Sequence, residues 1–277
     1  MPLFDLLLNL AGLLLWFGWR AVGLDQTTRP APLSLVSTLR RAESRPARPW
    51  PLLAGLGALL LMRSTIYWRL GPRTGWAPAL DLGLVSVSFR VDLWHQALVF
   101  SVASFLHAWV IIHVAILLII LLNRKSPEAG PFQALLNAQW GWLGRWPASI
   151  LLMLIPLLGA GLWLVMHPLF LWLELTSGPP PGIPPLQQAL AFGLSLFLLW
   201  EFVALGLLLI HTINTYVYVG NLGLWNCLAN AGRILCRRLP LRVGRIDLAP
   251  FAAALMVLAL AYSARHGIDH LFIRTLL

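Results

Sequence analysis

The residues best suited to chemistry are two histidines inside long apolar runs. His113 precedes Asn123 by ten residues, and His211 precedes Asn221 by ten residues. Ten helical residues rise about 15 Å, so both imidazoles are expected near the bilayer midplane if each asparagine closes its span. Two facing histidines could ligate a b-type haem or relay a proton. Alternatively, each forms a hydrogen bond to a neighbouring helix and stabilises the bundle.

A carboxylate in another apolar run is the next candidate. Glu201 lies about 30 Å from Asn221 along a helix, so it is expected near the opposite membrane boundary. If Glu201 lies deeper, it would pair with His107 or Arg63, or belong to a transport path. Arg63 itself interrupts an apolar run, and its side chain is expected to extend outward to the interface.

The composition indicates which elements position these groups. Of 277 residues, 59% are hydrophobic and 11% are charged, whereas soluble domains carry about 25% charged residues. The mean hydropathy is +0.78. We therefore predict an all-α membrane protein with about six transmembrane helices. The expected spans are 3–22, the run opened by Trp50-Pro51, 93–122, 147–173, 186–219 and the run opened by Pro250.

No motif indicates an enzyme. The chain has no P-loop, no GxSxG, no His-Glu-x-x-His and no dinucleotide-binding fingerprint. Cys227 and Cys236 would point to opposite faces of one helix, so no local disulfide or metal site is expected. We predict no catalytic residue and no resident cofactor, with haem at His113 and His211 as the alternative.

The net charge is +10, and the distribution of the basic residues along the chain predicts the membrane topology. Fourteen of the twenty basic residues fall in or beside the loops after the first, third and fifth spans. The positive-inside rule makes these loops cytoplasmic and both termini periplasmic in a bacterial inner membrane. The expected partners are anionic lipid headgroups and other membrane proteins or further copies of the chain, and nucleic-acid binding is not expected.

One pattern occurs three times along the chain. A span runs inward, a basic amphipathic stretch follows, and a proline step opens a span that runs outward. Three parallel out–in–out hairpin repeats with interfacial amphipathic helices are therefore predicted. The expected divisions are 1–70 for the first repeat, 71–92 for an outer loop, 93–177 for the second repeat, 178–185 for a Pro/Gly-rich outer loop and 186–277 for the third repeat. Residues 82–89 alternate as a strand does, but this loop is expected to be too short to form a sheet alone.

The third inner stretch has the clearest pattern. Leu224, Leu228 and Leu235 share one helical stripe, with Asn230 and Arg233 opposite. This arrangement predicts an interfacial helix in the headgroup plane, with a helix that binds a partner as the alternative. A basic segment follows, in which Asp247 is expected to cap the last span and Pro250 to fit its first turn.

The segment after that helix contains a characteristic series of residues, namely Arg237, Arg238, Pro240, Gly244, Ile246, Asp247 and Pro250. In these residues it resembles the YggT family, also called YlmG, and the resemblance covers about residues 205–265. Ala249 stands where the family usually has serine. Arg242 and Arg245 lie among the motif residues and belong with them to the predicted basic surface.

The resemblance implies a small membrane protein linked to cell division, envelope organisation or, in plastids, haem attachment. We therefore expect a non-enzymatic scaffold or assembly factor that acts through its basic cytoplasmic surface. A small ion or solute transporter that uses His113, His211, Glu201 and His107 is the alternative. A haem-binding factor is the further alternative.

Overall fold

The structure is a computed structural model, and it is predominantly helical. It describes residues 2–28, 49–81, 86–124, 146–173, 184–217, 223–237, 239, 241–243 and 246–273. Within these ranges, six helical segments are long and apolar enough to cross a membrane. The predicted multi-pass helical architecture is therefore confirmed at this level, whereas the three-repeat arrangement and its orientation stay predictions.

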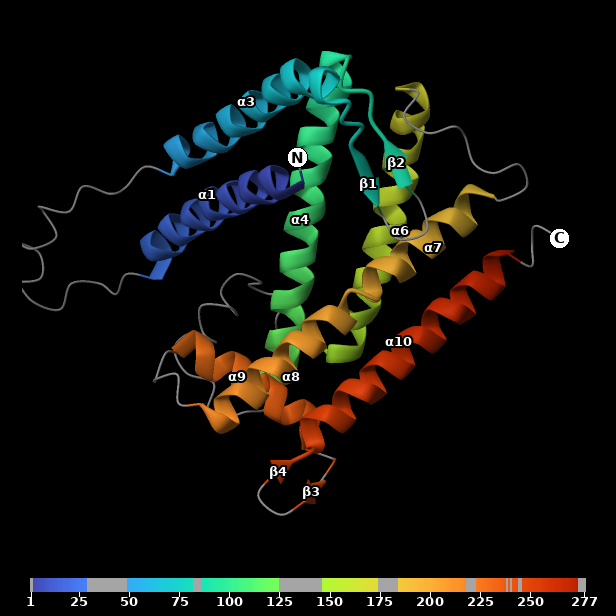
Figure 1. Ribbon diagram of the computed structural model, residues 1–277. Coiled ribbons are helices and arrows are strands. Elements are labelled where there is room, and N and C mark those ends of the chain that lie inside the picture. The colour runs from blue at the N-terminus through green and yellow to red at the C-terminus, as the bar shows by residue number, and fades with distance from the viewer. Residues whose placement is uncertain are drawn as a thin grey trace, which may run out of the picture. The chain divides into compact units, whose positions relative to one another are not determined.

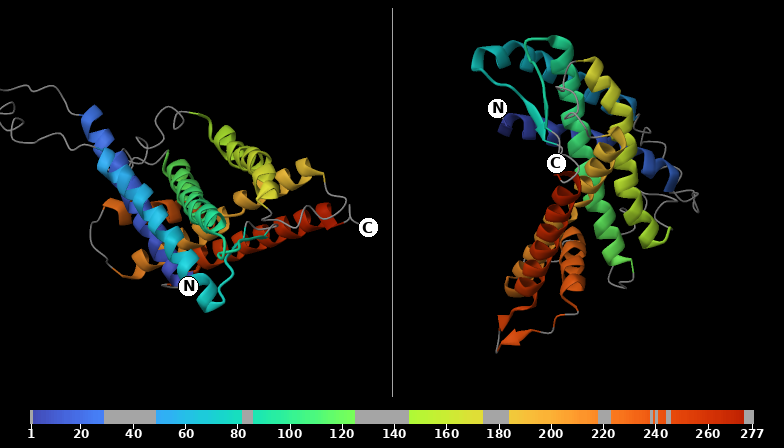
Figure 2. Two further views of the ribbon diagram at one scale, coloured as in Figure 1. Left: turned by 90° about the horizontal axis from the view of Figure 1, so that it is seen from above. Right: turned by 90° about the vertical axis from the view of Figure 1, so that its right-hand side faces the viewer.

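The chain forms two compact units, which are described separately. The first comprises residues 1–80 and 88–109, and the second comprises 81–87 and 110–277. The first unit contains α1 (Pro2–Thr28), α3 (Trp50–Thr74) and the first half of α4 (Trp94–Asn123). Figures 1 and 2 show α1 and α3 lying side by side. Pro51 occupies the first turn of α3, where its missing N–H costs nothing. Gly75 ends α3 with a positive φ of 61°.

The loop after α3 differs from the prediction. Strands β1 (Ala79–Asp81) and β2 (Ser86–Ser88) pair as a two-stranded sheet, so the expectation that this loop could not form a sheet is wrong. At the described end of the predicted alternating stretch, Val87 and Phe89 on one side are buried while Ser88 is exposed, and residues 82–85 lie outside the described residues. The Phe89 ring lies 5.2 Å from the Phe100 ring of α4. The loop residues therefore contribute to a core rather than to a surface strip.

The second unit contains the second half of α4 and the remaining helices. These are α6 (Ala148–Trp172), α7 (Pro185–Phe197), α8 (Trp200–Tyr216), α9 (Gly223–Cys236) and α10 (Ala249–Ile273). The short strands β3 (Arg242–Val243) and β4 (Ile246–Asp247) form an antiparallel hairpin between α9 and α10. All three predicted proline steps open helices, since α3 begins at Trp50, α6 follows Pro147 and α10 begins at Ala249.

The predicted fifth span is present as one candidate span, Pro185–Tyr216, and it consists of two helices. A turn at Leu198 and Leu199 separates α7 from α8. The two halves pack mainly on different partners, because α7 lies against α6 whereas α8 lies against α9 and α10. Gly159 and Gly193 permit the close α6–α7 approach, since a Cβ at Gly159 would lie 2.9 Å from the Gly193 Cα.

Candidate functional site

The described part of the basic segment after α9 contains a hairpin. In its hairpin, Arg242 is paired with Asp247 and Val243 with Ile246. The Asp247 amide donates a hydrogen bond to the Tyr216 hydroxyl at the end of α8, at 3.1 Å. The Asp247 carboxylate accepts a hydrogen bond from the Ala249 amide, at 3.0 Å. The predicted cap on the last span is therefore confirmed, and Pro250 occupies the first turn of α10 as expected.

Most of the motif residues can be placed along this segment. Arg237 is exposed just after α9, Arg242 begins β3, and Ile246 and Asp247 form β4. Arg238, Pro240, Gly244 and Arg245 lie outside the described residues. The segment thus connects α9 to α10 through a hairpin that is bonded to the end of α8.

The buried side of α9 differs from the predicted leucine stripe. Leu224 is 49% exposed, whereas Asn230 is only 7% exposed. The helix instead presents small side chains to α8 and α10, and at Gly232 a Cβ would collide with the Leu207 carbonyl and the His211 Cβ of α8. Burial, together with the negative charge of Asp247, raises the pKa of the Cys236 thiol to about 11. Asn230, expected on the polar face opposite the leucine stripe, is therefore buried instead, whereas the exposure of Leu224 leaves the predicted interfacial placement of the stripe a prediction.

Asn230 is buried because it joins two helices. Its side-chain amide donates a 2.7 Å hydrogen bond to the Asn123 Oδ1 atom at the end of α4. The Asn123 Nδ2 atom in turn donates to the Cys227 carbonyl at 3.1 Å. From the exposed side of α9, Arg233 donates to the Asn230 Oδ1 atom at 2.7 Å. This polar chain fixes α9 against the end of α4 and extends to an exposed arginine.

Glu201 forms an ion pair that the sequence did not predict, while its position near a membrane boundary stays a prediction. Its side chain is 6% exposed and forms an ion pair with Arg265 of α10. The predicted partner Arg63 is instead bonded to residues of its own unit. Glu201 stands in the first turn of α8, where the helix dipole favours a negative charge. Because Arg265 is half exposed, the pair extends from the buried interior to the surface of the unit.

The remaining predicted polar residues are half buried. His107 and His113 lie on α4, and His211 lies on α8 with its Cβ against Gly232 of α9. Among the residues that the structure describes, no group of three or more His, Cys, Asp or Glu side chains could hold a metal ion. Haem ligation or proton transfer by His113 and His211 stays a prediction.

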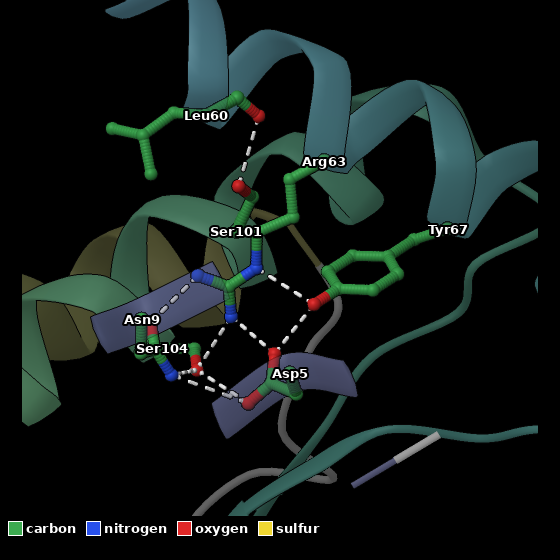
Figure 3. A network of polar contacts seen from close by, with 7 residues as sticks. All are labelled: Asp5, Asn9, Leu60, Arg63, Tyr67, Ser101 and Ser104. Atoms are coloured by element: carbon green, nitrogen blue, oxygen red, sulfur yellow. Dashed lines mark hydrogen bonds and ion pairs between the residues drawn. The ribbon is translucent and has the colours of Figure 1, made fainter. Parts of the chain in front are cut away.

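A polar network in the first unit was not predicted (Figure 3). Arg63 is completely buried, so the expectation that it extends outward is wrong. Its guanidinium forms an ion pair with Asp5 of α1 and donates to Asn9 of α1 at 2.6 Å. It also donates to Tyr67 of α3 at 2.7 Å and to Ser104 of α4 at 2.9 Å. We call these five residues the Asp5–Arg63 network.

The local spacing of these residues explains how the network forms. Asp5 and Asn9 are four residues apart on α1, as are Arg63 and Tyr67 on α3, so each pair lies on one helical face. Nearby, the Ser101 hydroxyl of α4 donates to the Leu60 carbonyl of α3 at 2.9 Å. Pairs of polar residues four positions apart in apolar helices, such as Asp5 and Asn9, were the sequence signal from which this network could have been predicted.

Comparison with models of known families, with curated proteins and with solved structures finds no match for this chain. The functional argument therefore depends on the residues and contacts described above. Two sets stand out, namely the folded basic segment of the second unit and the buried ionic groups of both units.

We predict that Asn230→Ala destabilises the second unit. The substitution removes the donor to the buried Asn123 Oδ1 atom, and an unsatisfied buried polar group costs about 1–3 kcal/mol. Thermal unfolding in detergent should show a lower midpoint. Ser263→Ala is the control, because this exposed hydroxyl bonds only to the Ala259 carbonyl of its own helix among the described contacts. Equal midpoints for the two variants would contradict the prediction.

We also predict that Arg265→Gln destabilises the α8–α10 contact. The variant leaves the buried Glu201 carboxylate without its cationic partner. Loss of a hydrogen bond to a charged group typically costs about 1.5–3 kcal/mol. The same unfolding assay measures this loss. The exposed pair of Arg90 and Asp92 supplies the control, since Arg90→Gln should change the midpoint little.

Proposed function

We propose that this chain is a non-enzymatic multi-pass membrane scaffold of the YggT type. In this proposal it resides in a bacterial inner membrane and acts through a basic surface, formed by α9 and the β3–β4 hairpin, on the cytoplasmic side. One observation carries the proposal: the basic segment is a folded element fastened to membrane helices, through Tyr216 and through the Asp247 cap of α10. A loop that only connects two spans needs no such fixation.

The burial pattern of α9 supports a role at the membrane surface. The helix is too short and too polar to be a candidate span, and it stands between two helices that are candidates. It buries small side chains on α8 and exposes Arg233, and Arg237 is exposed directly after it. Each basic residue near an anionic membrane surface contributes about 1 kcal/mol to binding. Arginines held on a fixed element can engage phosphate headgroups, or an acidic partner at the same surface.

The environment of Glu201 favours the scaffold over the transporter alternative. Its carboxylate is already neutralised by Arg265, which lies on a neighbouring helix of the same unit. In a scaffold such a pair stabilises the helix contact, whereas a transport site must exchange its partner for a substrate. A Soret band from protein purified after haem supplementation would instead support the haem alternative.

The proposal predicts that Arg237→Gln/Arg242→Gln weakens the association of anionic lipid. Two lost charges should reduce retention of phosphatidylglycerol by about thirtyfold, because Arg237 directly follows α9 and Arg242 belongs to the hairpin. Native mass spectrometry of protein from mixed phosphatidylglycerol–phosphatidylcholine nanodiscs measures the retained lipid.

The matched control is Arg69→Gln/Arg73→Gln, which removes two exposed arginines near the end of α3. This variant should retain lipid as the unmodified chain does. Equal loss from both variants would contradict the proposal. So would proton or solute flux in proteoliposomes that His211→Ala abolishes, since such flux would favour the transporter.

A further inference from the structure

The Asp5–Arg63 network joins three helices, each of which is a candidate membrane span. Asp5 and Asn9 lie on α1, Arg63 and Tyr67 on α3, and Ser104 on α4. The side chain of Arg63 is 1% exposed, whereas that of Asp5 is 19% exposed. A charged guanidinium this deeply buried requires compensation by neighbouring groups.

The hydrogen atoms of the network can be assigned individually. The Tyr67 hydroxyl accepts from the Arg63 Nε atom and therefore donates its own hydrogen to the Asp5 Oδ1 atom, at 2.6 Å. The Ser104 hydroxyl accepts from Arg63 and from Asn9, and it donates its hydrogen to the Asp5 Oδ2 atom at 3.0 Å. The Asn9 amide donates to Asp5 as well.

Both oxygens of Asp5 are therefore acceptors. Oδ1 accepts from Arg63 and Tyr67, and Oδ2 accepts from Ser104 and Asn9. A neutral carboxylic acid would bring its own hydrogen into this arrangement and displace one of these donors. The arrangement is complete when Asp5 is ionised, and the negative charge is what balances Arg63.

Apolar side chains of α1 also pack on α3 and α4. Gly12 lies against Phe105 of α4 and Leu56 of α3, and the Trp16 ring packs edge-on against the Trp109 ring of α4 at 5.8 Å. Lipid tails are as apolar as these side chains, so burial of such surface drives little association inside a bilayer. The ionic network is thus the interaction that distinguishes a docked α1 from one surrounded by lipid.

We propose that α1 is held on α3 and α4 by the charge of Asp5 and detaches when that charge is lost. Without the carboxylate, Arg63 becomes a buried cation with only neutral partners. A buried charge without a counter-charge costs more free energy than a buried neutral group at the same place. Asp5 is the more exposed member of the pair, so its carboxylate is more accessible from outside the unit than the Arg63 guanidinium is. The docking of α1 is therefore a charge-dependent conformational device, separate from the basic surface of the second unit.

Cross-linking of the full chain in nanodiscs tests this proposal. The reporter carries Trp16→Cys and Trp109→Cys, at two side chains in direct contact, in a background of Cys227→Ala and Cys236→Ala. A short bismaleimide should join α1 to α4 efficiently. Adding Asp5→Asn should slow cross-linking at least about tenfold, since removal of one partner leaves a buried charge uncompensated. Adding Asp92→Asn, at an exposed carboxylate of the same unit, should leave it unchanged.

A variant that lacks both charges of the network distinguishes the effect of the ion pair from the effect of the hydrogen-bond geometry. Asp5→Asn combined with Arg63→Met should recover cross-linking to within about twofold of the reporter alone, because replacing a buried pair by neutral groups is often tolerated. Undiminished cross-linking in Asp5→Asn would overturn the proposal. Cross-linking that stays low in the combined variant would also overturn it, since the network would then act through its hydrogen-bond geometry. If Asp5→Asn fails to accumulate in membranes, accumulation of the combined variant provides the same comparison.

Discussion

The structure depends on the requirement that a polar group in hydrocarbon finds its partner within the protein. The Asp5–Arg63 ion pair shows this requirement most clearly, because a completely buried guanidinium is balanced by one carboxylate and three neutral groups. The second unit meets the same requirement differently. There, Asn230 joins α9 to α4, and Glu201 joins α8 to α10 through Arg265. Since apolar contacts compete with equally apolar lipid, these polar contacts decide which helix packs on which neighbour.

Close backbone packing supports the polar contacts. At Gly193, a Cβ would collide with the Pro156 carbonyl of α6, and at Gly232 it would collide with the Leu207 carbonyl of α8. Small residues at such positions let two helices approach closely enough for many weak dispersion contacts. Close approach at glycines thus shapes the α6–α7 and α8–α9 contacts. The contacts of α1 and α10 combine an ion pair with apolar packing, at Gly12 against Phe105 for α1 and at Ala253 and Val257 for α10.

Much of the fold could be predicted because it is encoded locally. Each proline step marks a helix start, apolar length marks a span, and Asp247 followed by Ala249-Pro250 marks a cap. The partners of ionic residues are not encoded locally, since they depend on which helices become neighbours. Arg63 was expected to extend outward because it interrupts an apolar run, whereas its partner Asp5 lies 58 positions away in the sequence. Asn230 was placed on the polar face because its periodicity is that of Arg233, and periodicity does not reveal that Asn123 needs a donor.

The basic surface and the polar contacts between helices meet at one residue. Arg233 is exposed on α9, and it also donates to the Asn230 amide oxygen, whose nitrogen donates to Asn123. A guanidinium that leaves Asn230 to bind an external anion would remove one donor from this buried chain. The Asn123–Asn230 bond itself would persist, since it uses the opposite end of the amide. In the proposed function, a ligand that binds Arg233 competes with its hydrogen bond to Asn230, whereas Arg237 lies beyond α9 and takes no part in this bond. Because the Asn123–Asn230 bond is independent of Arg233, the α4–α9 contact is retained in either case.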